Sequence, residues 1–167
     1  MTITTLRAAA LLCATITMGL VSGAFAIYAH TIMPGLKTTD DRTFVAAFQS
    51  MDRAILNPWF MAGAFVGALL FTTAALLTHL GRAPLPWIAV ALALYLVAFV
   101  VTIVVHVPLN DAIKAAGDPD QIRDLAGVRD RFHETRWAAW NLVRVIASTG
   151  AFGCLAWALV LYGRSTA

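Results

Sequence analysis

Apolar residues dominate four long stretches of this chain, and charged residues gather in the segments between them. The stretches cover residues 8–29, 58–80, 85–107 and 137–162. Each is at least as long as the roughly 20 residues that an α-helix needs to cross a bilayer. The pattern therefore predicts an all-α fold, a four-helix transmembrane bundle with both termini on one side of the membrane.

Two long connections, one after the first stretch and one after the third, are predicted to carry short amphipathic helices. In the first connection, apolar side chains recur at the spacing of one helix face: Phe44, Phe48, Met51 and Ile55. The pair Asn57-Pro58 is expected to end that helix, because the residue before a proline disfavours helical backbone. The apolar stretches lie too close together to form separate units, so residues 1–167 are expected to be a single membrane domain.

Proline and glycine predict further helix boundaries. The first membrane helix is expected to end at His30, before the turn Met33-Pro34-Gly35. In the second connection, Gly117 is expected to close a helix. The sequence Asp118-Pro119-Asp120-Gln121 is expected to begin the next helix, because it offers a capping side chain, a proline and an acidic first turn.

Composition favours a multi-pass integral membrane protein, with the lipid bilayer as its partner. The chain is 60% hydrophobic and 13% charged, and its mean hydropathy is +0.76, whereas about a quarter of the residues in a soluble domain are charged. A formal net charge of +3 gives no reason to expect nucleic-acid binding. Cys13 and Cys154 both lie in apolar stretches, so they indicate buried thiols and not a disulfide framework.

The first two stretches leave alternatives open. The sequence Ala24-Phe25-Ala26 would satisfy a signal-peptidase cleavage rule, but the apolar run continues beyond it, which favours an uncleaved membrane helix. Gly19 and Gly23 form a GxxxG pair, and Gly63 and Gly67 form a second one. Such pairs let helix backbones approach closely, so a homo-oligomer is one expectation and coincidence in glycine-rich helices is the other.

A polar sequence leads into the fourth stretch. Read as a helix, it places five side chains on one face: His133, Trp137, Trp140, Asn141 and Arg144. A cation at the depth of Arg144 is costly in a bilayer and usually faces a bundle interior or a wet cavity. We therefore expect a pocket in which Asn110, Asn141 and Arg144 approach one another, with Asp111 and Glu134 as the nearest carboxylates in sequence. The alternative is an interfacial tryptophan belt, with Arg144 extending to the lipid headgroups.

Three of the four histidines fall on the side of the long connections: His30, His106 and His133. Three imidazoles at one end of a small bundle could bind a metal ion, and one of them could act as a general base. They could also be interfacial residues without a shared role, because they come from separate segments and their spacing carries no motif. A histidine-bound metal and a mechanism without any cofactor therefore both stay open.

Four short motifs follow one another along the chain: Met33-Pro34-Gly35-Leu36, Ile55-Leu56-Asn57-Pro58-Trp59-Phe60, Val107-Pro108-Leu109-Asn110 and Trp137-x-x-Trp140-Asn141-x-x-Arg144. Together they resemble the anthrone oxygenase-like family of small four-helix membrane proteins, over nearly the whole chain. The family takes its name from members that oxidise polyketide anthrones to anthraquinones with oxygen. The resemblance implies a role for the residues that match its motifs: Asn57, Pro58, Pro108, Asn110, Trp140, Asn141 and Arg144.

Anthrone oxidation can be compared with the residues directly. An anthrone carries an acidic C–H between two aromatic rings, and removal of that proton gives an enolate that can react with oxygen. His133 or His106 is the expected base, and Arg144 and Asn141 are expected to hold the enolate oxygen, with Asn110 beside them. Four residues are expected to bind the planar substrate: Trp137, Trp140, Trp59 and Asn57.

Two functions from different classes follow. The first is a membrane oxidoreductase of the anthrone oxygenase type, which oxidises a lipophilic aromatic or phenolic small molecule with oxygen. The alternative is a non-catalytic membrane protein that binds a lipophilic ligand or a partner membrane protein, and the glycine pairs are its main support. A cavity beside Arg144 would favour the first hypothesis, and a packed interior would favour the second.

Overall fold

A computed structural model describes residues 2–166 of the chain. Within these residues the fold is all-helical, and four helical segments are long and apolar enough to cross a membrane. They span Ile3–Lys37, Trp59–Thr78, Leu85–Ala115 and Leu125–Ser165. The predicted all-α architecture is confirmed, although three of the segments extend beyond the predicted limits.

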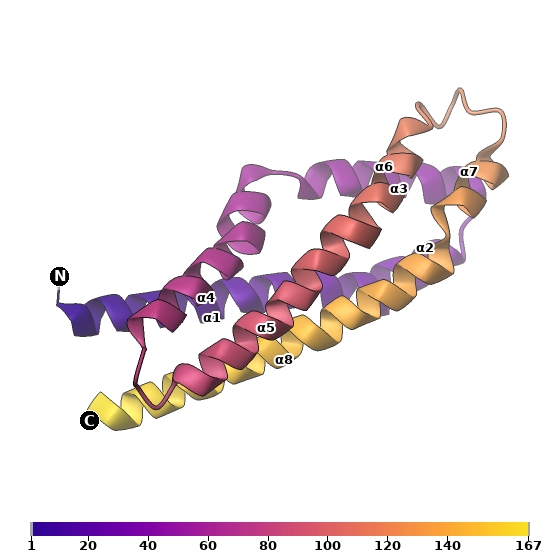
Figure 1. Ribbon diagram of the computed structural model, residues 1–167. Coiled ribbons are helices and arrows are strands. Elements are labelled where there is room, and N and C mark those ends of the chain that lie inside the picture. The colour runs from indigo at the N-terminus through magenta and orange to yellow at the C-terminus, as the bar shows by residue number, and fades with distance from the viewer. Residues whose placement is uncertain (1, 167) are drawn as a thin grey trace.

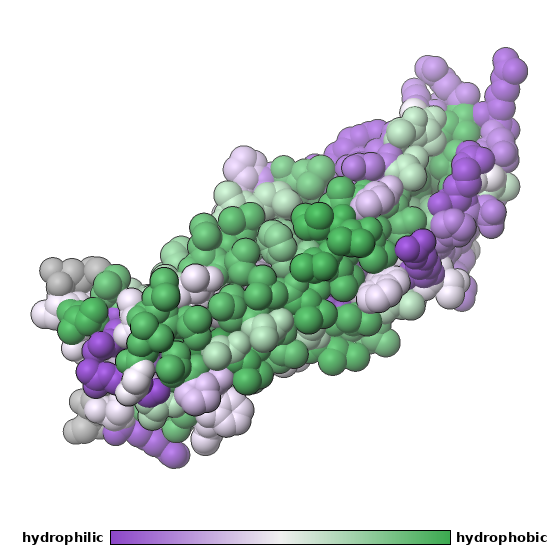
Figure 2. Space-filling model, viewed as in Figure 1, coloured by the Kyte–Doolittle hydropathy of each residue, from purple (hydrophilic) through white to green (hydrophobic). Residues whose placement is uncertain are grey.

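The four segments pack against one another as neighbours in a ring. The long helix α8 (Glu134–Thr166) lies against α1 (Ile3–Ile27) and α5 (Leu85–Val101), and α4 (Gly67–Thr78) contacts the same two helices. Both ends of the chain lie beside the short turn between α4 and α5, and the two long connections lie at the opposite end (Figure 1). The surface between the two polar ends is apolar (Figure 2), as lipid contact would require.

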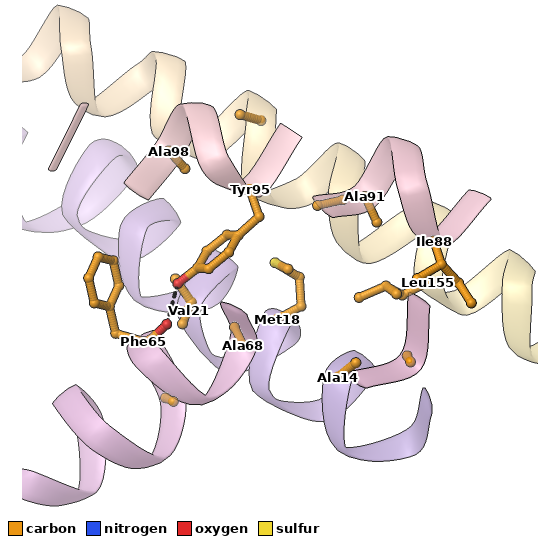
Figure 3. Close-up of a cluster of buried hydrophobic side chains, with 14 of the residues drawn as sticks. Ala14, Met18, Val21, Phe65, Ala68, Ile88, Ala91, Tyr95, Ala98 and Leu155 are labelled. Atoms are coloured by element: carbon orange, nitrogen blue, oxygen red, sulfur yellow. Dashed lines mark hydrogen bonds between the residues drawn. The ribbon is translucent and has the colours of Figure 1, made fainter. Parts of the chain in front are cut away.

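Alanines and larger apolar side chains alternate in the core of the bundle (Figure 3). The alanines let the helix backbones approach, and Met18, Ile88 and Tyr95 fill the space between them. The hydroxyl of the fully buried Tyr95 donates a hydrogen bond to the carbonyl oxygen of Phe65 at 2.7 Å. That bond satisfies the polar atom of the side chain, so Tyr95 fits an otherwise apolar interior.

One member of the first glycine pair, Gly19, contributes to packing within the chain. A Cβ atom at Gly19 would lie 3.0 Å from the ring of Phe152 on α8, whereas Gly23 and Gly63 have no such neighbour within 4 Å. Gly19 therefore permits close contact between α1 and α8. Association of two chains through these glycines stays a prediction.

The helix α3 (Asp41–Ile55) is the predicted amphipathic helix of the first connection, and it ends at the predicted place. The side chain of Asp40 caps its first turn by accepting a backbone N–H, and this bond lowers the pKa of Asp40 below its usual value. Phe44 and Phe48 are buried in an apolar cluster that includes Trp137 of α8. The apolar face of α3 thus covers one end of the bundle.

Three membrane segments contain a stretch of π-helix: η1 (Tyr28–Ile32), η2 (Trp59–Val66) and η3 (Thr102–His106). In η1 and η3 the π-helix ends two residues before a proline, Pro34 or Pro108. A wider turn makes room for the pyrrolidine ring and removes the need for the N–H that proline lacks.

Both helices consequently continue past their prolines. The first membrane segment runs on through α2 (Met33–Lys37), and the third runs on through α6 (Val107–Ala115). The predicted ends at His30 and at residue 107 are therefore wrong, because the π-helical turns absorb the disruption that a proline causes in a regular α-helix.

The second connection contains α7 (Leu125–Phe132), which begins after the capping residue Asp124. Gly117 follows the preceding helix with a φ of 90°, as predicted for a residue that closes a helix. The helix start predicted at Asp118-Pro119-Asp120-Gln121 is wrong, because these residues form turns. His133 separates α7 from α8 and adopts a left-handed conformation with a φ of 52°.

Candidate functional site

A cavity of about 100 Å³ lies between the membrane segments at the end that α3 covers. Six aromatic side chains contribute to its wall: Phe25, Tyr28, Phe48, Phe60, Phe65 and Trp137. Each of the three π-helices contributes to this wall, through Tyr28 in η1, Phe60 in η2 and Thr102 in η3. Interruptions of this kind are frequent at functional sites.

Arg144 is the cation of this cavity, and its side chain is buried with 6% of its surface exposed. Its Nη2 donates to Asn141 Oδ1 at 2.7 Å, and its Nη1 lies 3.3 Å from the hydroxyl of Thr102. The guanidinium carbon lies 4.2 Å above the ring of Phe25. Within the described chain no carboxylate pairs with Arg144, and its Nε has no hydrogen-bond acceptor.

Asp52 of α3 is the carboxylate of the same cavity, and it is also buried, with 7% of its surface exposed. Asn110 donates to Asp52 Oδ1 at 2.6 Å, and Lys114 Nζ lies 2.7 Å from Asp52 Oδ2. The indole N–H of Trp137 donates to Asn110 Oδ1 at 2.8 Å, which fixes the orientation of the Asn110 amide. The charge of Asp52 is thus balanced by Lys114, whereas the charge of Arg144 is not balanced by any described carboxylate.

His106 also lines the cavity, but both of its ring nitrogens are occupied. Nδ1 lies 3.3 Å from the carbonyl oxygen of Val101, and Nε2 lies 3.3 Å from that of Trp137. Carbonyl oxygens only accept hydrogen bonds and a neutral imidazole carries a single N–H, so one of these two contacts is a hydrogen bond and the other nitrogen keeps its lone pair. Both oxygens of Asp52 also have partners, Asn110 and Lys114, but an ionised carboxylate has further lone pairs with which it can accept a proton from a ligand in the cavity.

Several residues of the predicted site do come together. Trp137, Asn110 and Arg144 line the cavity, and Asn141 lies behind Arg144 in the α8–α1 contact. The amide of Asn141 donates to the carbonyl oxygen of Phe25 at 3.1 Å, so it ties α8 to α1 while it orients the guanidinium. Asn110 bonds to Asp52 and Trp137 and has no hydrogen bond with Arg144.

Other predicted site residues lie outside this cavity. His133 is exposed and borders a separate hollow with Arg129 and Glu134, because the left-handed turn before α8 removes it from the helix face of Arg144. Trp140 is 40% exposed, since it lies a quarter-turn away from Asn141 around α8.

Asn57 and Trp59, which the sequence predicts to bind substrate, do not line this cavity. Trp59 is 67% exposed on the surface of the bundle. Asn57 Oδ1 accepts the backbone N–H of Phe60 at 2.9 Å, so this residue caps the start of the second membrane segment.

The three histidines do not form a shared metal site. His30 and His133 are exposed, whereas His106 is buried in the cavity wall. Among residues 2–166 no group of three His, Cys, Asp or Glu side chains is arranged to hold a metal ion. The two carboxylates named as nearest to Arg144 in sequence pair elsewhere, Asp111 with Lys114 at 3.1 Å and Glu134 with Arg129 at 3.2 Å.

Asp52 is the functional candidate that the sequence reasoning missed. It lies four residues after Phe48 and three before Ile55, on the apolar face of α3. A carboxylate on the apolar face of an amphipathic helix is unusual, because burial of an isolated charge is costly. That position was the signal that could have identified Asp52.

The sequence model of the anthrone oxygenase family matches residues 44–154, which is more than half of the chain. The matched region includes Asp52, Asn110, Trp137 and Arg144. No curated protein and no solved structure shows a significant match to the chain. The protein belongs to the anthrone oxygenase family.

Proposed function

We propose that the protein is a membrane-embedded oxygenase that oxidises a lipophilic anthrone-like or phenolic substrate in the cavity between Asp52 and Arg144. One observation carries the proposal: a buried guanidinium, which has no carboxylate partner among residues 2–166, borders a cavity that is lined by aromatic rings and by a buried carboxylate. This arrangement suits a planar apolar molecule that becomes an anion during the reaction.

Arg144 is proposed to stabilise the oxygen on which negative charge develops. Its charge has no carboxylate partner in the described chain, and its Nε–H has no acceptor there. Fixed donors in a site that excludes water stabilise a developing oxyanion more than water does, because they need no reorganisation during the reaction. The contacts with Asn141 and Phe25 hold the guanidinium in place before the substrate arrives.

Asp52 is proposed to take the proton. As the C–H bond of the substrate breaks, its electron pair moves through the ring to the carbonyl oxygen, which becomes the enolate oxygen beside Arg144. The reacting carbon and the carbonyl oxygen of an anthrone lie on opposite sides of its central ring. A base and a donor at separate places on the wall therefore fit such a substrate.

Molecular oxygen is the co-substrate of the proposed reaction. Oxygen forms a C–O bond with the enolate carbon and takes up the proton held by Asp52, which gives a hydroperoxide. The O–O bond then breaks as the second C–H proton leaves, and water is released. Overall a CH₂ group becomes a ketone, with one oxygen atom in the product and the other in water.

Access from the bilayer is consistent with a lipophilic substrate. Leu56 and Val107 border the cavity, and they are 52% and 40% exposed on the apolar surface. The volume of about 100 Å³ is below the ~300 Å³ of a small ligand site. A substrate with three fused rings would therefore extend between these rim residues toward the lipid, or displace them on binding.

Oxygen consumption by purified protein in detergent, with a model hydroxyanthrone, tests the proposal. Asp52→Asn should lower the enzymatic rate by at least about a hundredfold, the typical contribution of a general base. Asp111→Asn is the matched control, because Asp111 also pairs with Lys114 but is largely exposed and outside the cavity. It should keep the wild-type rate.

Spontaneous oxidation of the substrate must be subtracted with a protein-free sample. Equal rates for the two aspartate variants would refute the role of Asp52. Tight binding of the hydroxyanthrone without any enzymatic oxygen consumption would refute the oxygenase and favour a protein that only binds such ligands.

A further inference from the structure

A second cavity lies at the opposite end of the bundle, where the chain ends meet the turn between α4 and α5 (Figure 1). Its volume of about 220 Å³ is far above the ~30 Å³ that a water molecule occupies in the liquid. Four polar side chains from separate elements line it: Arg7 of α1, His79 at the end of α4, Arg82 of the turn and Tyr162 of α8. The proposed oxidation does not involve any of them.

The sequence places no Asp or Glu side chain in the segments that form this end of the bundle. All nine Asp and Glu residues lie between residues 40 and 134, and none lies in the α4–α5 turn. Arg7 donates from Nε to the carbonyl oxygen of Thr78 at 2.7 Å, which fixes its position at the cavity. Arg82 is exposed and has no ion-pair partner among the described side chains. Two guanidinium groups thus border the cavity, and no Asp or Glu side chain among residues 2–166 pairs with either of them.

His79 supplies an independent indication of a ligand. Its side chain is fully buried, and Nδ1 lies 2.8 Å from the carbonyl oxygen of Ala75. Because a carbonyl only accepts, Nδ1 carries the hydrogen, and Nε2 of the neutral ring is left as an acceptor. This Nε2 is buried and has no hydrogen-bond partner within residues 2–166. Buried polar atoms are normally paired, so a partner from outside the chain is expected.

The protonation of His79 depends on the groups around it. Burial and the positive charges of Arg7 and Arg82 lower the pKa of His79 below its usual value. The ring of Tyr162 packs against the imidazole at a centroid distance of 5.3 Å. An anion in the cavity would oppose the effect of the arginines and favour the imidazolium, whose Nε2–H could then donate to that anion.

We propose that this cavity binds a phosphate group, whose oxygens pair with Arg7 and Arg82 and accept a hydrogen bond from His79 Nε2. The planar guanidinium fork matches the oxygens of a phosphate. The cavity lies at the end of the apolar spans, since His79 directly follows the span Trp59–Thr78, and phospholipid headgroups gather where such spans end. A phospholipid and free phosphate offer the same chemistry, so the experiment separates these two sources.

Thermal unfolding of delipidated protein in detergent provides the test. Phosphatidylglycerol should raise the melting temperature in a saturable manner, and a diacylglycerol with the same acyl chains should not. Arg82→Gln should weaken binding of phosphatidylglycerol by at least about tenfold, because a hydrogen bond between charged groups is lost. Arg164→Gln is the matched control: Arg164 lies at the same end, but it packs on Trp157 and does not line the cavity.

The pH dependence of binding tests the part of His79. The phosphodiester of phosphatidylglycerol keeps one charge where histidine titrates, so a change in affinity reports the protein. Wild-type protein should bind this lipid several-fold more tightly at about pH 6 than at about pH 8, and His79→Gln should lose that difference. A parallel titration with inorganic phosphate assigns the source: comparable affinity at low concentration indicates free phosphate, and much weaker binding indicates the lipid.

Two results would overturn the proposal. One is equal stabilisation by phosphatidylglycerol and diacylglycerol, which would leave no role for the phosphate. The other is equal affinity of the Arg82→Gln and Arg164→Gln variants, which would mean that positive charge anywhere at this end is sufficient. Neither result depends on oxygenase activity, so this test is independent of the proposed reaction.

Discussion

Replacement of Arg144 by leucine is expected to preserve the fold while it removes the cation of the cavity. Arg144 is buried among aromatic rings and lacks a carboxylate partner in the described structure. An embedded charge of this kind contributes less to stability than its hydrogen bonds suggest, because its desolvation opposes them.

The structure allows the magnitude to be worked out. Removal of an arginine charge from bilayer depth gains ~2.5–3.5 kcal/mol. Loss of the bond from Arg144 leaves Asn141 Oδ1 without its donor, which costs ~1–3 kcal/mol, and loss of the contact with the Phe25 ring costs ~1–2 kcal/mol. Thr102 keeps its bond to the carbonyl oxygen of Ala98. The net change therefore lies between a loss of about 2.5 kcal/mol and a gain of about 1.5 kcal/mol.

Thermal unfolding in detergent measures this change. A change of 1 kcal/mol corresponds to roughly 2–4 °C for a chain of this size, so Arg144→Leu should shift the melting temperature by no more than about 10 °C. Arg129→Leu is the comparison, because Arg129 pairs with Asp41 and Glu134 and should cause a larger loss when replaced. If Arg144→Leu is the more damaging substitution, Arg144 is a structural tie between helices and the argument for a free cation fails.

Three further predictions concern helix packing, the pH dependence of stability, and the part of Trp59 in substrate binding. Gly19→Leu should lower the melting temperature, because its side chain would collide with the ring of Phe152, whereas Gly23→Leu points into open space and should not. The pKa of His79 is lowered in the folded protein, so its neutral form should stabilise the fold above about pH 6.5, and this contribution should be lost as the pH falls. Melting curves in phosphate-free detergent measure the effect, and an unchanged acid sensitivity in His79→Gln would contradict it. Trp59→Ala should leave oxygen consumption unchanged, because the indole is exposed outside the cavity; a large loss of rate would return Trp59 to the substrate site.

The sequence predicted the membrane helices because their signal is local and strong. A single long apolar segment in a bilayer has to be helical, because only a helix pairs all of its backbone N–H and C=O groups within the segment itself. The boundaries were less predictable, because whether Pro34 and Pro108 end a helix depends on the π-helical turns before them. A proline in a long apolar stretch is compatible with a helix end and with a π-helical turn, so the sequence alone does not distinguish the two.

The candidate site was predictable in part for the same reason. Trp137, Asn141 and Arg144 share one face of an uninterrupted helix, so their spacing placed them correctly. His133 was expected on the same face of that helix, but its left-handed backbone conformation separates α7 from α8 and so removes it from that face. Asp52 comes from a different helix, and its approach to Asn110 depends on how α3 docks over the bundle, which local periodicity cannot specify.

Oxygen consumption by the Arg144→Leu variant tests the central claim most directly. The claim is that oxidation takes place in the cavity at Arg144, where the cation stabilises an enolate oxygen. Wild-type protein in detergent should consume oxygen and form the anthraquinone from a hydroxyanthrone, and the folded Arg144→Leu protein should lose nearly all of this activity. A folded Arg144→Leu protein that oxidises the substrate at the wild-type rate would contradict the account.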